Sequence, residues 1–238
     1  MTESHSHNEG VPEVKIGIIG AGSIGGTLTR RLSALGHEVR VSNSRSPETL
    51  SELAAETGAQ AVWSSEAALD ADLVIVSIPQ KNVPDLAAGI VDAAKDGAPI
   101  IETNNYYPQQ RDGLIADIEN GKPESVWVAE HLGSRGADVV KVFNGIYWKH
   151  LLEKGQPKSA AGRIALPIAG ADGPGKDVVF DVVEQLGFDP VDGGALADSW
   201  RQHPGTPVYG KDFDTDGVKA ALAEATTERA PEWSAATA

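Results

Sequence analysis

The sequence predicts an α/β protein built around a doubly wound parallel sheet, with a small α+β domain at its C-terminal end. Short apolar segments that suit buried strands alternate along the chain with segments that suit helices. The first apolar segment, residues 15–19, leads directly into a glycine-rich turn and a helical pattern. The 238 residues are 41% hydrophobic, which is enough for the core of one large domain with a small extension.

The turn after residues 15–19 contains three glycines in the spacing G-x-G-x-x-G, namely Gly20, Gly22 and Gly25. We expect Gly20 to permit a tight turn, Gly22 to let the backbone approach a pyrophosphate, and Gly25 to let a helix pack closely on the sheet. The same spacing also occurs in structural turns of other α/β folds, so the surrounding sequence decides its interpretation.

The surrounding sequence is that of a dinucleotide-binding unit. A helix is expected at 23–35, where Gly36 ends it, and a second strand at 37–42. The first helical residues, Ser23 and Ile24, would direct free N–H groups and the positive end of the helix dipole toward phosphates. We therefore predict that this unit binds a dinucleotide.

The residues that follow the second strand indicate whether the dinucleotide is NAD(H) or NADP(H). An NAD site places Asp or Glu about 20 residues after the glycines, to accept the ribose hydroxyls. This chain has Asn43, Ser44 and Arg45 there, and the nearest acidic residues, Glu38 and Glu48, lie outside the turn. A guanidinium beside hydroxyl and amide donors suits a 2′-phosphate, so the predicted cofactor is NADP(H). The alternative is that Arg45 is a solvated turn residue.

The rest of the chain continues the alternation of strands and helices. Strands are predicted at 59–63, 72–78, 98–102, 138–144, 163–170 and 188–191. Helices are predicted at 47–56, 64–69, 83–94, 112–120, 125–132, 145–152, 174–186, 195–201 and 215–229. Because Pro167 interrupts one strand, that strand should lie near an edge of the sheet.

Changes in composition along the chain predict three segments. We expect residues 1–13 to form a disordered tail, because they are polar and precede the first strand. Residues 14–152 are predicted to form the NADP-binding domain. Residues 154–162 are rich in Gly, Pro, Lys and Ser, which is typical of a linker or exposed loop. The small C-terminal domain is therefore expected at 153–238, with a frayed end.

Two more loops follow predicted strands at their carboxyl ends, where ligands bind in such sheets. The first contains Ser77, Ile78 and Pro79. The second reads TNNYYP from residue 103, and its Thr103 and Asn104 could bond a nicotinamide carboxamide or ribose, while its tyrosines could stack on a flat ring. The alternative is a turn whose asparagine side chains satisfy its own backbone.

The charge of the chain limits its partners. The formal net charge is −14 and the calculated pI is about 4.8, which argues against nucleic acid or an anionic membrane as a partner. The first residues are polar and unlike a secretory signal, and no apolar run reaches the roughly 18 residues of a membrane span. We expect a cytoplasmic protein that acts on a small molecule.

No catalytic residue and no metal site is predicted. The chain has no cysteine, and His131, His150 and His203 are far apart in the sequence. Lys141 and Asn144 have the K-x-x-N spacing of some NADPH-dependent reductases, but they lie on a predicted strand and its tip rather than on a helix.

The segments GAGSIG, SNSR, SIPQ, TNNYYP, KVFN and LADSWRQHPGTP together resemble one family, the NADPH-dependent coenzyme F-420 reductases, also called F-420-dependent NADP oxidoreductases. The resemblance spans residues 15–207. It implies a Rossmann domain, a small C-terminal domain, a deazaflavin between them over the nicotinamide, and a homodimer. It also implies that Ser44 and Arg45 hold the 2′-phosphate, and that Ile78 and Pro79 line the nicotinamide end of the site.

Three functions are consistent with these observations. The first is an NADPH-dependent oxidoreductase that transfers hydride between NADP(H) and coenzyme F-420 or a flavin-like acceptor, which needs no protein acid or base. Flavin is included because cytosolic domains of membrane metalloreductases share this fold and pass hydride to a flavin. The second is a β-hydroxyacid-dehydrogenase or imine-reductase type of enzyme, which reduces a small carbonyl or imine and needs a proton donor. The third is a non-catalytic NADPH sensor.

Overall fold

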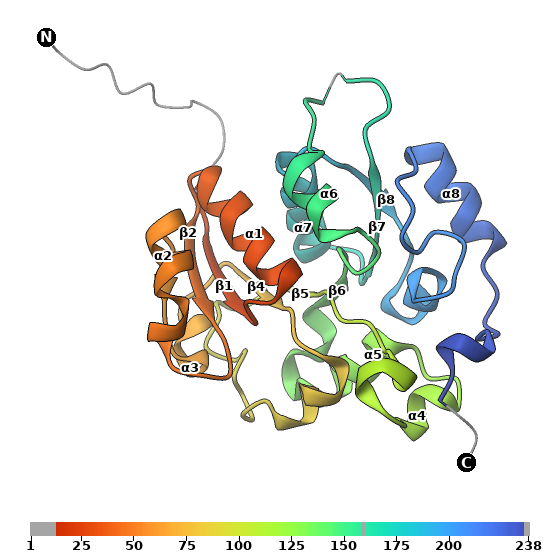
Figure 1. Cartoon of the computed structure of the whole chain (residues 1–238), viewed down its shortest axis with the longest axis horizontal. Helices are drawn as coiled ribbons and strands as arrows, with labels where there is room; N and C mark the ends of the chain where they lie inside the picture. Colours follow the sequence, from red (N-terminus) through yellow and green to blue (C-terminus); the bar gives the residue numbers. More distant parts are fainter. Residues whose placement is uncertain (1–12, 159, 236–238) are drawn as a thin grey trace, which may run out of the picture.

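The structure is a computed structural model that describes residues 13–158 and 160–235. Within this part of the chain, eight strands form a sheet in the order β3-β2-β1-β4-β5-β6-β7-β8 (Figure 1). The strands are β1 (Lys15–Ile19), β2 (Glu38–Ser42), β3 (Gln60–Ala61), β4 (Leu73–Val76), β5 (Ile100–Glu102), β6 (Val139–Lys141), β7 (Ala165–Gly170) and β8 (Asp189–Asp192). The predicted tail at 1–13 lies, apart from residue 13, outside the described residues.

The strand order confirms the predicted fold class. From β1 the chain builds the sheet in one direction through β2 and β3, and then in the other through β4, β5 and β6, always with parallel neighbours. The order therefore reverses between β1 and β4, which is the point where such folds bind dinucleotides. One pairing, of β6 with β7, is antiparallel, so the sheet is mainly rather than entirely parallel.

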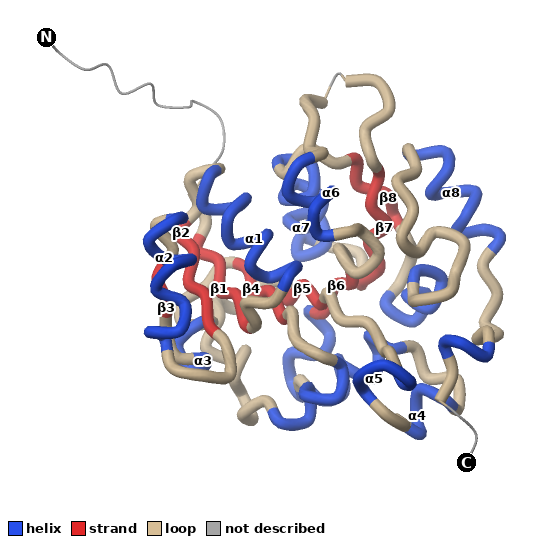
Figure 2. Tube along the Cα trace, in the orientation of Figure 1, coloured by secondary structure: helices blue, strands red, loops and turns tan. Residues whose placement is uncertain are grey.

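Most of the predicted helices are present, but those predicted at 112–120 and 215–229 are shorter, and the one predicted at 83–94 is absent (Figure 2). The helices are α1 (Ser23–Ala34), α2 (Ser51–Thr57), α3 (Ser64–Ala67), α4 (Ala116–Glu119), α5 (Glu124–His131), α6 (Trp148–Glu153), α7 (Pro174–Gln185) and α8 (Thr215–Glu224).

The helix predicted at 83–94 is wrong. A 3-10 segment covers Gln80–Asp85, and turns follow it as far as residue 97. Pro84 has no N–H for an α-helical hydrogen bond, and Leu86 is already extended, with ψ 136°. Gly89 then adopts φ +72°, a left-handed conformation that interrupts a helix. Val83, Val91 and Ala94 of this segment are nevertheless buried in the core.

Two separate cores cover the two faces of the sheet. On one face, Ile16 and Ile18 of β1 pack in a cluster with Leu28 and Leu32 of α1, together with side chains of α2, α6 and α7. On the other face, a second cluster joins β4 and β5 to Trp127 of α5 and to α3. Successive side chains of a strand point to opposite faces, so these strands are apolar on both sides, as their continuous Ile and Val runs predicted.

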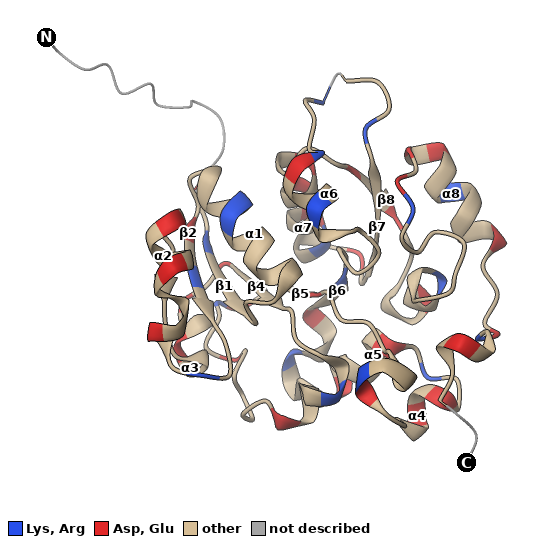
Figure 3. Ribbon diagram, in the orientation of Figure 1, with Lys and Arg blue, Asp and Glu red and all other residues tan. Residues whose placement is uncertain are grey.

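The C-terminal segment extends the same sheet. Its strand β7 pairs with β6 on one side and with the edge strand β8 on the other, and α8 packs against both through a small cluster around Val218. Pro167 thus lies one strand from the edge of the sheet. The division into domains at 152/153 and the homodimer stay predictions. Acidic residues occur in α2, α4 and α8 (Figure 3).

Arg31 ties α1 to the C-terminal half of the chain. Its guanidinium donates hydrogen bonds to Leu152 O at 2.9 Å and to Leu186 O at 2.7 Å, at the ends of α6 and α7. Substitution Arg31→Met leaves these carbonyls without a donor, so we expect the free energy of unfolding to fall by about 2–4 kcal/mol, as measured by urea denaturation.

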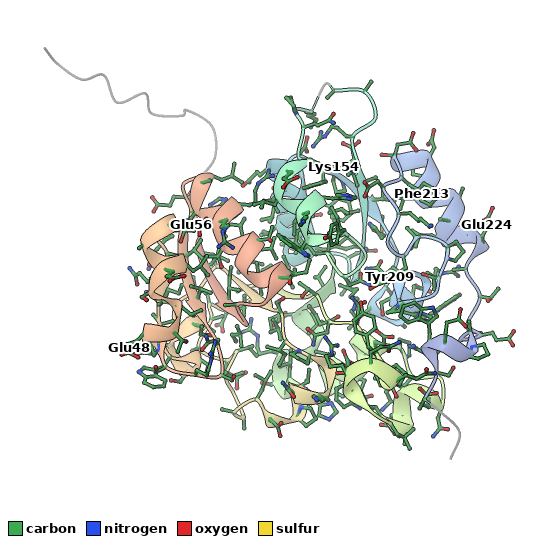
Figure 4. The ribbon with its side chains drawn as sticks, viewed as in Figure 1. Glu48, Glu56, Lys154, Tyr209, Phe213 and Glu224 are labelled. Carbon is green, nitrogen blue, oxygen red and sulfur yellow. The ribbon has the colours of Figure 1, made fainter. Side chains whose placement is uncertain are left out.

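The neighbouring Arg30 is the matched control on the same helix. It forms an exposed ion pair with Glu56, labelled in Figure 4, at 2.7 Å. Exposed pairs contribute at most about 1 kcal/mol, so Arg30→Met should change stability far less than Arg31→Met does. Equal effects of the two substitutions would contradict the role given to Arg31.

Candidate functional site

The loops at the carboxyl ends of β1, β2, β4 and β5 are joined into one surface by hydrogen bonds. The Gly20 N–H donates to Ser42 O at 2.9 Å, which links the glycine turn to the end of β2. The Ser77 N–H donates to Ile19 O at 2.8 Å, and the Thr103 hydroxyl donates to Ser77 Oγ at 2.9 Å. Every segment predicted to bind the cofactor therefore lies at the same edge of the sheet.

Two of the three glycines are required by close packing. Gly20 has φ +108°, and a Cβ on it would overlap the Ser77 carbonyl. A Cβ on Gly25 would overlap the carbonyl of Gly20, so the helix could not lie this close to the turn. These contacts agree with the roles expected from the sequence, a tight turn and a close approach of helix to sheet.

Gly22 differs from the other two glycines. It is exposed, it precedes α1 as the N-cap residue, and a Cβ on it would have no protein atom within 4 Å. Its backbone has φ −74°, which any residue adopts. The protein therefore has no packing reason for glycine at this position, and the space beside it is free for a ligand.

The N-terminus of α1 is suited to an anion. Its first turn contains no acidic residue, and no side chain caps it. Ser23 is exposed and lines a pocket of about 310 Å³ together with Thr49 and Trp148, and Ile24 is partly exposed. Uncapped N–H groups and the helix dipole favour a phosphate there, so this end of α1 fits the pyrophosphate of a dinucleotide.

The turn after β2 presents the residues predicted to select NADP(H). The Arg45 N–H donates to Asn43 Oδ1 at 2.8 Å, and the Asn43 amide donates to Thr49 Oγ1 at 2.9 Å, which fixes the backbone of the turn. The side chains of Ser44 and Arg45 are exposed, and Arg45 forms no ion pair within the part of the chain that the structure describes. The guanidinium is thus available to an external anion.

The loops after β4 and β5 hold each other through their own side chains. Asn104 is 3% exposed, and its Oδ1 accepts from the Ile78 N–H at 3.3 Å. Thr103, 5% exposed, bonds to Ser77 as described above. Pro79 is partly exposed beside them. The Asn104 Nδ2 atom is buried without a partner in the described residues, which leaves one donor at this end of the site.

The two tyrosines of the TNNYYP segment do not offer a free stacking surface. Tyr106 is fully buried, and its hydroxyl donates to Gly113 O at 2.9 Å. Burial raises the pKa of Tyr106 to about 12. Tyr107 is partly buried, its hydroxyl contacts that of Tyr209, labelled in Figure 4, and its ring lies 6.0 Å from that of Trp233. The idea that both rings stack on an acceptor is therefore wrong for Tyr106.

A buried ion pair lies beneath this surface, and the sequence did not reveal it. The Lys141 ammonium lies 3.1 Å from Glu102 Oε2, and the two side chains are 1% and 0% exposed. Lys141 also donates to Asn104 O, while Glu102 accepts from the Asn104 N–H and from Ser125 Oγ at 2.7 Å. These bonds hold the loop after β5 in place.

Asn144, the second residue of the K-x-x-N pair, also serves the structure. Its Nδ2 donates to Gln202 O at 2.7 Å and to Asn105 Oδ1 at 3.1 Å, while its Oδ1 accepts from Gln202 at 3.2 Å. Asn144 therefore connects the loop after β5 with the 3-10 segment Leu196–Gln202 near the C-terminal end.

His203 is buried in the same C-terminal region. It is 5% exposed and bonds through Nδ1 to Pro204 O at 2.9 Å, beside a cavity of about 280 Å³. Burial lowers the pKa of His203 from its ordinary 6.5, the nearby Glu124 opposes this shift, and Arg229 adds to it. The ring is therefore neutral in the folded protein at neutral pH.

This depressed pKa has a consequence for stability. The unfolded chain protonates the residue near pH 6.5 and the folded chain does so only at lower pH, so the free energy of unfolding should fall as the pH drops below 6.5 and level off below the folded pKa. Urea denaturation at pH 7.5 and at lower pH measures this slope. In His203→Asn the slope should be smaller; an unchanged slope would contradict the assignment.

A sequence model of the family described as "NADP oxidoreductase coenzyme F-420-dependent" matches residues 15–106. This range begins at β1 and ends just beyond β5. It therefore contains the glycine turn, the Asn43–Arg45 turn, and both loops that close the nicotinamide end of the predicted site. The residues predicted to bind the cofactor all lie inside the matched range.

Curated proteins match parts of the chain, and two of them come from Escherichia coli and Salinibacter ruber. The protein YjhV of Escherichia coli K12 is 41% identical over 58 residues, which are 24% of this chain and 42% of YjhV. Erythronate-4-phosphate dehydrogenase of Salinibacter ruber is 36% identical over 115 residues, which are 46% of this chain and 29% of that enzyme. The chain thus spans less than half the length of either relative.

Solved structures resemble the chain over most of its length. The hypothetical protein SMa0349 of Sinorhizobium meliloti superposes with a TM-score of 0.70 at 29% identity, covering 85% of this chain and 95% of that one. A candidate F-420-dependent NADP reductase of Arthrobacter sp. FB24 superposes with a TM-score of 0.61 at 21% identity, covering 77% and 86%.

The 3-hydroxyisobutyrate dehydrogenase of Mycobacterium tuberculosis superposes with a TM-score of 0.56 at 19% identity, covering 79% of this chain and 57% of that one. At 19% and 21% sequence identity, this dehydrogenase and the Arthrobacter protein show that the chain shares a Rossmann fold with them. The match over residues 15–106 shows that the predicted cofactor-binding part of this chain is similar to the coenzyme F-420-dependent NADP oxidoreductases.

Proposed function

We propose that the protein is an NADP-dependent oxidoreductase that transfers hydride between NADP(H) and a planar, conjugated acceptor, either the deazaflavin coenzyme F-420 or a flavin. Transfer between two rings needs no protein acid or base, so positioning supplies most of the reduction in the barrier. The nicotinamide supplies or accepts the hydride when it is bound. The task of the protein is to bind the cofactor, orient its ring and keep water away from it.

The observation that carries the proposal is the burial of Lys141. An enzyme that reduces a carbonyl or imine needs a proton donor within reach of its substrate, and Lys141 was the candidate that the K-x-x-N spacing offered. Its side chain is 1% exposed, and its ammonium is bound to Glu102 and to the carbonyl of Asn104. A lysine held in this way supports the loop, and hydride transfer between two rings does not require it.

The residues that would hold NADP(H) follow from the surface described above. The N–H groups at Gly22 and the start of α1 would bind the pyrophosphate. Ser44 and Arg45 would bind the 2′-phosphate, since both are exposed at the end of β2. Ile78 and Pro79 would contact the nicotinamide end, on the loop that Asn104 holds.

The proposal can be tested with a charge-balanced variant. Lys141→Met alone leaves the buried Glu102 carboxylate uncompensated, so loss of stability would obscure its effect on activity. The double variant Glu102→Gln, Lys141→Met removes both charges. We expect it to retain most of the NADPH oxidation with coenzyme F-420, FAD or FMN, because neither side chain takes part in the chemistry.

The same assays should include small carbonyl and imine compounds with NADPH as the reductant. The proposal would be contradicted if the wild type reduced only a carbonyl or imine compound and the folded double variant had lost this activity. That result would favour the dehydrogenase or imine-reductase alternative. Comparison of the melting temperatures of wild type, single variant and double variant separates loss of fold from loss of chemistry.

A further inference from the structure

We propose that the buried ion pair between Glu124 and Arg229 positions the two loops at the nicotinamide end of the site, so that the segment 226–235 acts as a C-terminal strap for cofactor binding. This inference rests on the proposed use of NADP(H) at that surface. Neither residue contacts the predicted cofactor site directly, so both are positioning residues.

Glu124 joins the two loops through separate groups. Its Oε2 accepts the Tyr106 N–H at 3.0 Å, on the loop after β5. Its main-chain oxygen accepts from the Gln80 amide at 3.2 Å, on the loop after β4, and Gln80 is 0% exposed. Tyr106 and Gln80 follow closely after Asn104 and Pro79, so a shift of Glu124 would move both loops at once.

The charge of Glu124 is balanced from a distant part of the chain. Its side chain is 2% exposed, and its Oε1 accepts from Arg229 Nη2 at 2.5 Å. The Arg229 side chain is 11% exposed and lies over the Tyr106 ring, 5.4 Å from the centroid. A carboxylate buried to this degree needs a partner charge to keep its geometry, and Arg229 provides it.

The strap makes further contacts with the same loop. The Gln109 amide donates to Pro231 O and to Ser234 O, both at 2.9 Å. The Trp233 ring lies 6.0 Å from the rings of both Tyr107 and Tyr209. In Figure 1 the blue C-terminal segment descends from α8 to the α4–α5 region, which these contacts place beside the loop after β5.

A second buried carboxylate connects the same two loops without the strap. Asp112, with a fully buried side chain, accepts the Tyr107 N–H at 2.7 Å and the Lys81 N–H at 3.2 Å. Its partner is the adjacent Arg111, at 2.9 Å. The loops therefore stay attached to each other when the Glu124 contact is weakened, and we expect altered loop geometry rather than unfolding.

The test compares two ligands that occupy different parts of the site. The compound 2′,5′-ADP reaches the glycine turn and Arg45, whereas NADPH also reaches the loops after β4 and β5. In Arg229→Met we expect the Kd for 2′,5′-ADP to stay within about twofold and the Kd for NADPH to rise roughly tenfold. Arg229→Lys, which keeps a positive charge, should recover part of the NADPH affinity.

Arg201→Met is the matched control. Arg201 also lies near the C-terminal end, but it stacks on Trp200 at 4.5 Å and donates to Leu222 O at 3.1 Å. We expect this variant to bind both ligands like the wild type. If Arg229→Met does not fold, Trp233→Leu provides the same test without an uncompensated buried charge, with a smaller rise of about threefold in the NADPH Kd.

Amide hydrogen exchange gives a readout that depends on neither acceptor nor turnover. The Tyr106 amide should exchange faster in Arg229→Met, while amides of β1 and α1 should not change. Unchanged NADPH affinity, or equal weakening of NADPH and 2′,5′-ADP together with a general increase in exchange, would overturn the proposal. Failure to reduce any planar acceptor would overturn the proposed function and leave these binding results intact.

Discussion

Arg45→Ala is expected to weaken NADPH binding by roughly tenfold to a hundredfold and to leave NADH binding nearly unchanged, because a charge-assisted hydrogen bond contributes about 1.5–3 kcal/mol. Arg45 is exposed at the end of β2, on a turn whose backbone the Asn43 side chain fixes. NADH lacks the 2′-phosphate and therefore lacks the group that Arg45 binds. The measurement is the Kd of each dinucleotide by fluorescence or calorimetric titration.

The salt dependence of binding provides the control for this prediction. A guanidinium that contacts a phosphate dianion should make the wild-type affinity for NADPH fall with ionic strength more steeply than that of Arg45→Ala. Arg40→Ala is the comparison on the same strand, since Arg40 lies within β2 and pairs with Glu38 at 3.4 Å. Equal loss of NADH and NADPH in Arg45→Ala would contradict the assignment of the 2′-phosphate.

Gly22→Val is expected to abolish NADPH binding and turnover without unfolding the protein. A Cβ at Gly22 meets no protein atom within 4 Å, and its φ of −74° suits any residue. The branched side chain would, however, fill the space where the pyrophosphate approaches the helix N-terminus. We expect a melting temperature close to that of the wild type, with no NADPH-dependent increase in it.

Gly25→Ala is the contrasting variant. Its Cβ would overlap the Gly20 carbonyl, so the turn and the helix would have to separate, and the protein should lose stability whether or not a ligand is present. If Gly22→Val bound NADPH normally, the pyrophosphate could not lie against the start of α1. If Gly22→Val unfolded the protein, the space beside Gly22 would not accommodate a side chain.

Local sequence patterns predicted the first strand–helix–strand unit, residues 15–42, well. The strand at 15–19, the helix after it and the strand that ends at Ser42 depend on periodicity and glycine spacing, which are local properties. The helix predicted at 83–94 failed because Pro84 and Gly89 outweigh the helix-favouring residues around them. The antiparallel pairing of β7 with β6 joins Val140 to Gly170 and Lys141 to Ala169, which are far apart in the sequence, and no local pattern encodes it.

The supporting residues of the site could not be predicted in the same way. Glu102, Asp112 and Glu124 resemble ordinary surface acids in the sequence, yet each is buried and accepts backbone N–H groups from the loops. Their partners are up to 105 positions away, as for Arg229. The sequence offers one weak signal for their burial. Glu102 ends an apolar segment that suits a buried strand, and Asp112 and Glu124 lie at or next to the start of a predicted helix.

Isotope transfer from NADPH tests direct hydride transfer to a planar acceptor most directly. NADPH is prepared with deuterium in place of the nicotinamide hydrogen that is transferred, and it is mixed with the enzyme and coenzyme F-420 in ordinary water. The reduced deazaflavin is then analysed by mass spectrometry. We predict one deuterium in the product for each NADP⁺ formed, because the hydride moves to carbon and does not exchange with solvent. An unlabelled product would contradict the account, as would failure to reduce any deazaflavin or flavin when a carbonyl or imine is reduced.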